Sequence, residues 1–115
     1  SWNLVHCNNK PTKRYLHSMT ILNDKLWVCG GLSDGYLLEK CLWWIDINQL
    51  IDSTHKFNNE IHWNKVDNIL LESIYDSTFI GIDNQLIIIG GKMKKRRYNN
   101  NVYFIDTLNE NTCNI

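Results

Sequence analysis

Leu26-Trp27-Val28-Cys29-Gly30-Gly31 is the stretch that decides the predicted fold, because the chain contains it twice in outline. The second copy is Leu86-Ile87-Ile88-Ile89-Gly90-Gly91, again an apolar run that ends in a double glycine. The offset is 86 − 26 = 60 residues, and it holds without a gap from residues 17–46 to residues 77–106. Self-similarity at a fixed period indicates a repeat architecture. We therefore expect two copies of one structural unit.

Each copy has the pattern of short strands separated by polar turns. The first copy predicts strands at 17–22, 26–29, 41–47 and 61–66, with longer connections at 32–40 and 49–60. The second copy predicts strands at 78–82, 86–89 and 102–106, with a fourth strand missing or truncated. A short strand is also expected at 1–5. The double glycines end strands, because glycine adopts positive φ and admits a neighbouring backbone.

Composition excludes several classes of protein. The chain has 115 residues, of which 43% are hydrophobic, which suits one modest globular unit. Its net charge of zero argues against a general binder of nucleic acid or anionic membranes. No apolar run is long enough to cross a bilayer, and no signal peptide opens the sequence. The four cysteines form no CxxC pair, so we expect reduced thiols, which favours a cytoplasmic setting.

These motifs resemble the kelch repeat over nearly the whole chain. Residues 14–18 look like its Arg-x-x-His-Ser opening, and residues 101–106 look like its Asn-x-Val-Tyr-x-x-Asp-like strand. The first copy departs from the family in its Cys-Leu-Trp-Trp third strand, and the second lacks the opening Arg and His. The period of 60 also exceeds the usual length of about 50 residues. The structural motif positions are Trp2, Arg14, His17, Gly30, Gly31, Trp44, Asp46, Trp63, Gly90, Gly91, Tyr103 and Asp106.

The resemblance implies an all-β fold made of kelch-type β-propeller blades, each a four-stranded antiparallel sheet, in an incomplete propeller. Residues 1–13 would then be the last strand of a preceding blade and a turn, residues 14–69 a complete blade, and residues 70–115 a partial blade. Central strands between blades are expected to be buried on both faces. Two blades cannot close a ring, so further blades or self-association would be needed to cover the open faces.

No catalytic or metal site is expected. His17 and Ser18 are adjacent on a strand and point to opposite faces, so a structural, hydrogen-bonding histidine is the preferred interpretation. Asp46 and Asp106 occupy equivalent repeat positions, and each is expected to bond a loop amide. The remaining histidines have no metal-ligand spacing, and the glycine pairs introduce no phosphate-binding helix. We therefore predict no metal and no cofactor.

The loops that follow the two glycine pairs are the predicted contact surface, because variable loops on a rigid scaffold usually carry recognition. The second loop is strongly basic, and it could bind an acidic partner, act as a nuclear-localisation-like tract, or be a solvated loop. The first loop is apolar and mildly acidic. The candidate partner-binding residues are Asp34, Tyr36, Glu39, Lys92, Lys94, Lys95, Arg96, Arg97 and Tyr98.

Two classes of function follow from the resemblance. The preferred one is a non-enzymatic module, a scaffold or adaptor that presents its loops to a protein partner. The alternative is part of a catalytic propeller, such as a kelch-type oxidase or sugar isomerase. A copper oxidase would need tyrosine and histidine ligands and a cysteine near one tyrosine. Neither Tyr36 nor Tyr98 lies in such a pattern.

Overall fold

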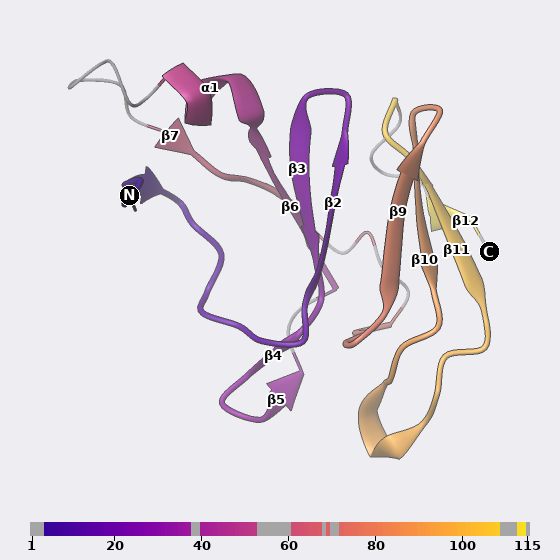
Figure 1. The fold of residues 1–115 in the computed structure, drawn as a ribbon. Helices are drawn as coiled ribbons and strands as arrows, with labels where there is room; N and C mark the ends of the chain where they lie inside the picture. Colours follow the sequence, from indigo (N-terminus) through magenta and orange to yellow (C-terminus); the bar gives the residue numbers. More distant parts are fainter. Residues whose placement is uncertain are drawn as a thin grey trace.

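The computed structural model describes residues 4–37, 40–52, 61–67, 69, 72–108 and 113–114. Two four-stranded antiparallel sheets stand side by side in it (Figure 1). The predicted all-β class is confirmed, because strands dominate the described chain and its helices are short. Trp2 and Glu39 lie outside the described residues.

The first sheet contains β2 (Ser18–Leu22), β3 (Lys25–Cys29), β6 (Leu42–Asp46) and β8 (Asn64–Val66), hydrogen-bonded in that order. The second sheet contains β9 (Thr78–Ile82), β10 (Gln85–Ile89), β11 (Val102–Asp106) and β12 (Cys113–Asn114), also in chain order. Each sheet is thus an antiparallel meander with the same strand order, and a fourth strand of two residues completes the second.

Matching two-residue turns join the first hairpin of each sheet. Asn23 and Asp24 lie between β2 and β3 with φ of 53° and 59°, and Asp83 and Asn84 lie between β9 and β10 with φ of 48° and 65°. Positive φ at both central residues is the type I′ geometry, and its twist suits an antiparallel hairpin. Asparagine and aspartate tolerate this conformation, so the local sequence fixes the strand register.

Six shorter elements complete the described part of the fold. β1 (Cys7–Asn8) pairs in parallel with β7 (Ile61–His62), and β4 (Leu32–Ser33) forms a small hairpin with β5 (Tyr36–Leu37). α1 (Ile47–Asp52) follows β6, and the 3₁₀ turn η2 (Lys94–Arg96) lies between β10 and β11. In the described residues, no helix has the length and apolarity that a membrane crossing requires.

Several local predictions are wrong. Residues 1–3 of the expected strand at 1–5 lie outside the described residues, residues 4–5 form no strand, and the first described strand begins at Cys7. The expected strand at 61–66 divides at Trp63, because β7 pairs with β1 whereas β8 pairs with β6. The expected loop at 32–40 contains the β4–β5 hairpin, and the expected connection at 49–60 begins inside α1, which starts at Ile47.

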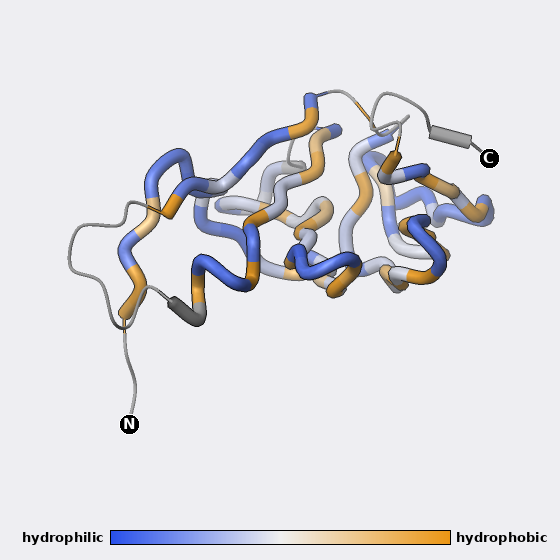
Figure 2. The backbone as a smooth tube through the Cα atoms, turned by 90° about the horizontal axis from the view of Figure 1, so that it is seen from above, coloured by the Kyte–Doolittle hydropathy of each residue, from blue (hydrophilic) through white to orange (hydrophobic). Residues whose placement is uncertain are grey.

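The core lies between the two sheets. In β3, Trp27 and Cys29 are almost fully buried, and they meet Phe79, Leu86 and Ile88 of the second sheet in one apolar cluster. Apolar stretches of the chain are separated by polar ones (Figure 2). The two sheets therefore share one core.

Burial of β10 on both faces was expected, and it occurs on one face only. Leu86 and Ile88 are fully buried, whereas Ile87 is half-buried and Ile89 is 41% exposed. The cause is that the described chain places a neighbouring sheet against one face of the second sheet but none against the other.

The sheets meet along their first strands, β2 and β9 (Figure 1). Gly81 allows this approach, since a Cβ there would lie 2.9 Å from the Ile21 carbonyl oxygen. Ser18 Oγ donates to the carbonyl of Ser77 at 2.5 Å, and Asn23 Nδ2 donates to Asn84 Oδ1 at 2.6 Å. Polar bonds therefore join the sheets at both ends of the two strands.

Candidate interaction surface

The double glycines direct the chain from each sheet into its following loop. A Cβ on Gly31 would lie 2.9 Å from the carbonyl oxygen of Tyr15, and a Cβ on Gly91 would lie 2.9 Å from that of Tyr75. These tyrosines are 60 residues apart, as the repeat predicts. Each tyrosine forms a two-bond antiparallel bridge, Tyr15 with Leu32 and Tyr75 with Lys92. The same backbone device thus starts both loops.

The first loop is the β4–β5 hairpin. Asp34 and Gly35 form its turn with φ of 52° and 82°, and Tyr36 is 77% exposed at its tip. Lys13 Nζ lies 3.6 Å from Asp34 Oδ1, but both side chains are largely exposed, so the pair adds little stability. A shallow, open depression of about 230 Å³ lies between this turn and residues 13–15.

The second loop carries the basic residues and is held at both ends. Met93 is buried, and its N–H donates to the carbonyl of Arg97 at 2.8 Å. Asn99 is also buried, and its Nδ2 donates to the carbonyls of Gly90 (2.8 Å) and Asn101 (3.1 Å). The second loop is therefore anchored by buried residues and hydrogen bonds, although its charged side chains face outward.

The cations of this loop fall into two groups. Lys92 Nζ lies 3.7 Å from Asp76 Oδ2, and one Arg97 guanidinium nitrogen lies 3.8 Å from Glu72 Oε1. Lys94, Lys95 and Arg96 are exposed, and no described acidic side chain lies within 4 Å of them. Tyr98, at 73% exposure, lies just beyond them. We call Lys94, Lys95, Arg96 and Tyr98 the basic tip.

Both loops emerge at the same end of the molecule, opposite the β2–β3 and β9–β10 turns (Figure 1). The structure thus brings Asp34 and Tyr36 to the same end as the basic tip, which lies on the neighbouring sheet. Glu39 cannot be placed, because it lies outside the described residues.

The two aspartates of the repeat bond to backbone. Asp46 Oδ1 accepts the N–H of Asn48 at 2.8 Å, and Asp106 Oδ1 accepts the N–H of Leu108 at 2.9 Å. Each bond has the same two-residue spacing, so both carboxylates hold the turn that follows the third strand of their sheet.

His17 does not make the hydrogen bond that the sequence suggested. Its side chain is exposed, and within the described part of the chain no hydrogen bond reaches its ring. Its Cβ lies 3.1 Å from where a Cβ on Gly31 would be. Partial burial and then the nearby charge of Arg14 lower its pKa from 6.5. Arg14 itself donates to the carbonyl of Gly30 at 3.0 Å.

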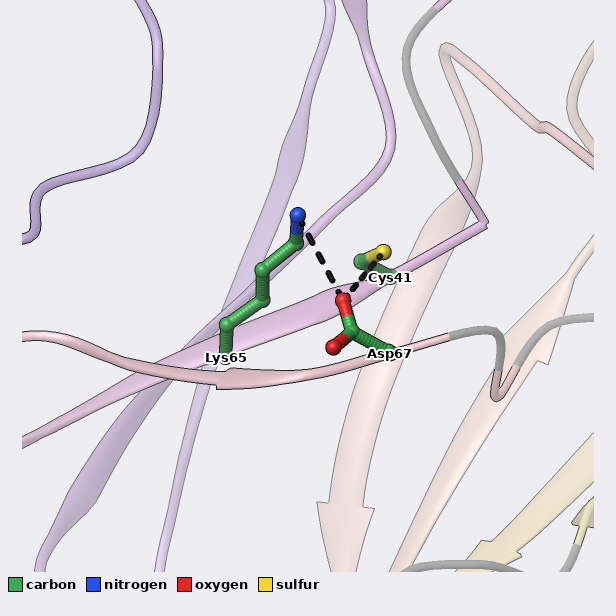
Figure 3. Close-up of polar contacts among 3 residues, drawn as sticks. All are labelled: Cys41, Lys65 and Asp67. Atoms are coloured by element: carbon green, nitrogen blue, oxygen red, sulfur yellow. Dashed lines mark hydrogen bonds and ion pairs between the residues drawn. The ribbon is translucent and has the colours of Figure 1, made fainter.

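A cluster of three polar side chains lies beside β6 and β8 (Figure 3). The buried Cys41 thiol donates to Asp67 Oδ1 at 3.6 Å, and Lys65 Nζ lies 3.4 Å from the same oxygen. Lys65 also lies 5.6 Å from the ring centroid of Trp43. The carboxylate receives both donors and ties the start of β6 to the end of β8. Among the described residues, no group of histidine, cysteine and acidic side chains is arranged to hold a metal ion.

Two residues of structural importance were missed in the sequence. Gly81 interrupts a predicted strand, and an isolated strand glycine is a signal of close backbone approach. Asn99 begins an Asn-Asn-Asn run, and such runs are typical of turns. Nothing in that run marks the first asparagine as the buried one.

No family model matches the chain, and no curated protein matches it. Among solved structures, it is similar to one titled "Structure of YjhT", with a TM-score of 0.64 and 16% sequence identity. The match covers 93% of this chain and 28% of that chain. The chain thus spans little more than a quarter of the length of this structural relative. At this identity the likeness concerns the fold alone.

Proposed function

We propose that the two sheets are neighbouring blades of a kelch-type β-propeller, with residues 14–69 and 70–115 as the two units. The support is the identical strand order of the sheets, the 60-residue register of their turns, and the contact between the first strands of each. This chain covers 28% of the length of the similar solved structure, which fits two blades of a larger propeller.

On this scaffold we propose a non-enzymatic function, the binding of a protein partner through the loops at one end. The observation that carries the proposal is the basic tip, which combines exposed cations that no described acidic side chain reaches with an exposed tyrosine on an anchored loop. Arginine and tyrosine are favoured in binding surfaces, and exposed cations steer acidic partners toward them. The partner expected is a protein with an acidic segment, and Tyr36 on the first loop would extend the contact.

The test is quantitative capture of cellular proteins by the chain and by a variant that combines Lys94→Ala, Lys95→Ala and Arg96→Ala. We expect the recovered partner to fall at least about tenfold, and its capture from wild type to weaken with salt. The variant should fold normally, since these side chains are exposed.

Lys10→Ala is the control, because this lysine is exposed and lies outside both loops. Capture by this variant should match the wild type. Equal loss in both variants would indicate non-specific charge attraction, and unchanged capture by the loop variant would exclude the basic tip as the binding site.

A further inference from the structure

The turns at residues 23–24, 34–35 and 83–84 share one backbone geometry. Each joins two neighbouring antiparallel strands, and both of its residues have positive φ. Each turn also contains an exposed aspartate, which is Asp24, Asp34 or Asp83. Of these three aspartates, only Asp34 is followed by a glycine. The β4–β5 turn therefore differs from the other two in the chemistry open to its aspartate.

The turns of the two long hairpins are fixed by hydrogen bonds from elsewhere in their sheets. The N–H of Ile47 donates to the Asp24 carbonyl at 2.9 Å, and the N–H of Thr107 donates to the Asn84 carbonyl at 2.9 Å. Each donor is the residue that follows the third strand of its sheet. These bonds restrict rotation of the backbone in both turns.

The β4–β5 turn lacks such a restraint. In the part of the chain that the structure describes, no backbone hydrogen bond from outside this hairpin reaches residues 34–35. A Cβ on Gly35 would meet no atom within 4 Å, so the space around the turn is open. The Lys13 ammonium lies 3.6 Å from the Asp34 carboxylate, but these side chains are 81% and 73% exposed, so the ion pair holds the turn only weakly.

We propose that Asp34-Gly35 is a modification site, at which the aspartate converts spontaneously to isoaspartate. The backbone nitrogen of Gly35 attacks the side-chain carboxyl carbon of Asp34 and closes a succinimide ring. One carboxyl oxygen leaves as water, together with the carboxyl proton and the amide proton. Water then opens the ring at the main-chain carbonyl, and the chain continues through the side-chain carbon. One water is lost and one is regained, so the conversion needs no oxidant and no cofactor.

Glycine makes the first step faster at Asp34 than at Asp24. Gly35 has no Cβ beside the attacking nitrogen, and its backbone can adopt conformations that are closed to other residues. The residue that follows Asp24 is Lys25, whose Nζ lies 4.1 Å from the ring centroid of Trp44. That contact holds the side chain next to the attacking nitrogen, whereas Gly35 has no side chain to hold.

The product changes the structure of the first loop. Isoaspartate adds a methylene to the backbone between Ser33 and Tyr36, so a two-residue turn no longer fits the pairing of these residues. The main-chain carboxyl group of the original aspartate becomes an exposed side group. A carboxyl methyltransferase that uses S-adenosylmethionine can transfer a methyl group to an oxygen of this carboxylate. The modification does not depend on the binding proposed for the basic tip, which lies on the other sheet.

Tryptic digestion of the chain after several weeks at pH 7.4 tests the proposal. Residues 26–40 form one peptide, with Asp34 as its sole aspartate and no asparagine, and residues 15–25 form another, with Asp24 as its sole aspartate. We expect a form of peptide 26–40 with unchanged mass and a different retention time. Its level of isoaspartate should be at least about tenfold higher than that of peptide 15–25. Equal levels would overturn the role of Gly35.

Asp34→Glu should abolish both this isomer and the transfer of labelled methyl groups to the aged chain, because glutamate must close a larger ring. A second measurement tests the part played by the fold. Unfolding in guanidinium chloride should speed the conversion at Asp34 less than about threefold, because the folded turn is already unrestrained. A larger increase would show that the fold protects Asp34. That result would overturn the proposal, as would an aged wild-type chain without isoaspartate at residue 34.

Discussion

At the scale of single residues, backbone conformation explains several positions that side-chain chemistry does not. Leu16 has φ of 54°, and its repeat equivalent Asp76 has φ of 57°. Both lie just before the first strand of their sheet, and Asp76 N–H donates to the Leu16 carbonyl at 2.8 Å. The backbone here is fixed by the contact between the two sheets, so the leucine is held in a left-handed conformation.

Leu16→Asn should therefore stabilise the chain. A left-handed conformation costs an L-residue about 1–2 kcal/mol, and asparagine avoids part of that cost through local hydrogen bonds. The Leu16 side chain is 44% exposed, so little burial is lost. We expect the free energy of unfolding to rise by about 0.5–1 kcal/mol in urea titrations. Leu4→Asn, at a more exposed position without positive φ, should change it by less than about 0.5 kcal/mol. A loss of stability in Leu16→Asn would show that its apolar contacts outweigh the strain.

His17 should make stability depend on pH. Its pKa in the folded chain is below 6.5, so the unfolded chain binds a proton more readily. The stability associated with neutral His17 is therefore complete above pH 6.5 and is lost as the pH falls through its folded pKa. The effect should be small, because the side chain is exposed. Between pH 7.5 and pH 5, the urea midpoint of His17→Gln should fall less than that of the wild type. Equal falls would assign the pH dependence to other groups.

At the scale of elements, the sequence predicts strands well where the turn residues are decisive. The I′ turn requires positive φ at both central residues, and the Asn-Asp and Asp-Asn pairs tolerate it, so they favour both hairpins. Prediction from the sequence fails where contacts between distant residues determine which strands pair. The pairing of β1 with β7 joins residues 54 positions apart (61 − 7 = 54), and it is this pairing that divides the predicted strand at Trp63.

The candidate site was predictable in part for the same reason. The positions of both loops follow from the glycine pairs, and their basic or acidic character is visible in the composition. The anchoring of the second loop by Met93 and Asn99 was not visible, because burial depends on neighbours that the local sequence does not specify. The one-sided burial of β10 has the same cause.

The contact between β2 and β9 should depend on Gly81. A Cβ at this position would lie 2.9 Å from both the Ile21 carbonyl oxygen and the Leu22 Cβ, so a larger side chain must push the strands apart. Gly81→Val should lower the free energy of unfolding by about 1–3 kcal/mol, the usual cost of overpacking. Ile21→Val, an exposed change on the facing strand, should stay within about 0.5 kcal/mol. If Gly81→Val is instead as stable as the wild type, the strands can separate without loss of packing.

At the scale of the whole molecule, one shared core implies one cooperative unit. Trp27 of the first sheet and Ile88 of the second belong to the same buried cluster, and polar bonds join the sheets at both ends of β2 and β9. Ile88→Val should remove about 0.5–1.5 kcal/mol of stability. In hydrogen exchange, the slowest amides of β3 should then lose protection by the same factor as those of β10, because both exchange through global unfolding. Ile21→Val makes the same chemical change at an exposed position and should leave both sets unchanged. Loss of protection confined to β10 would mean that the sheets unfold separately.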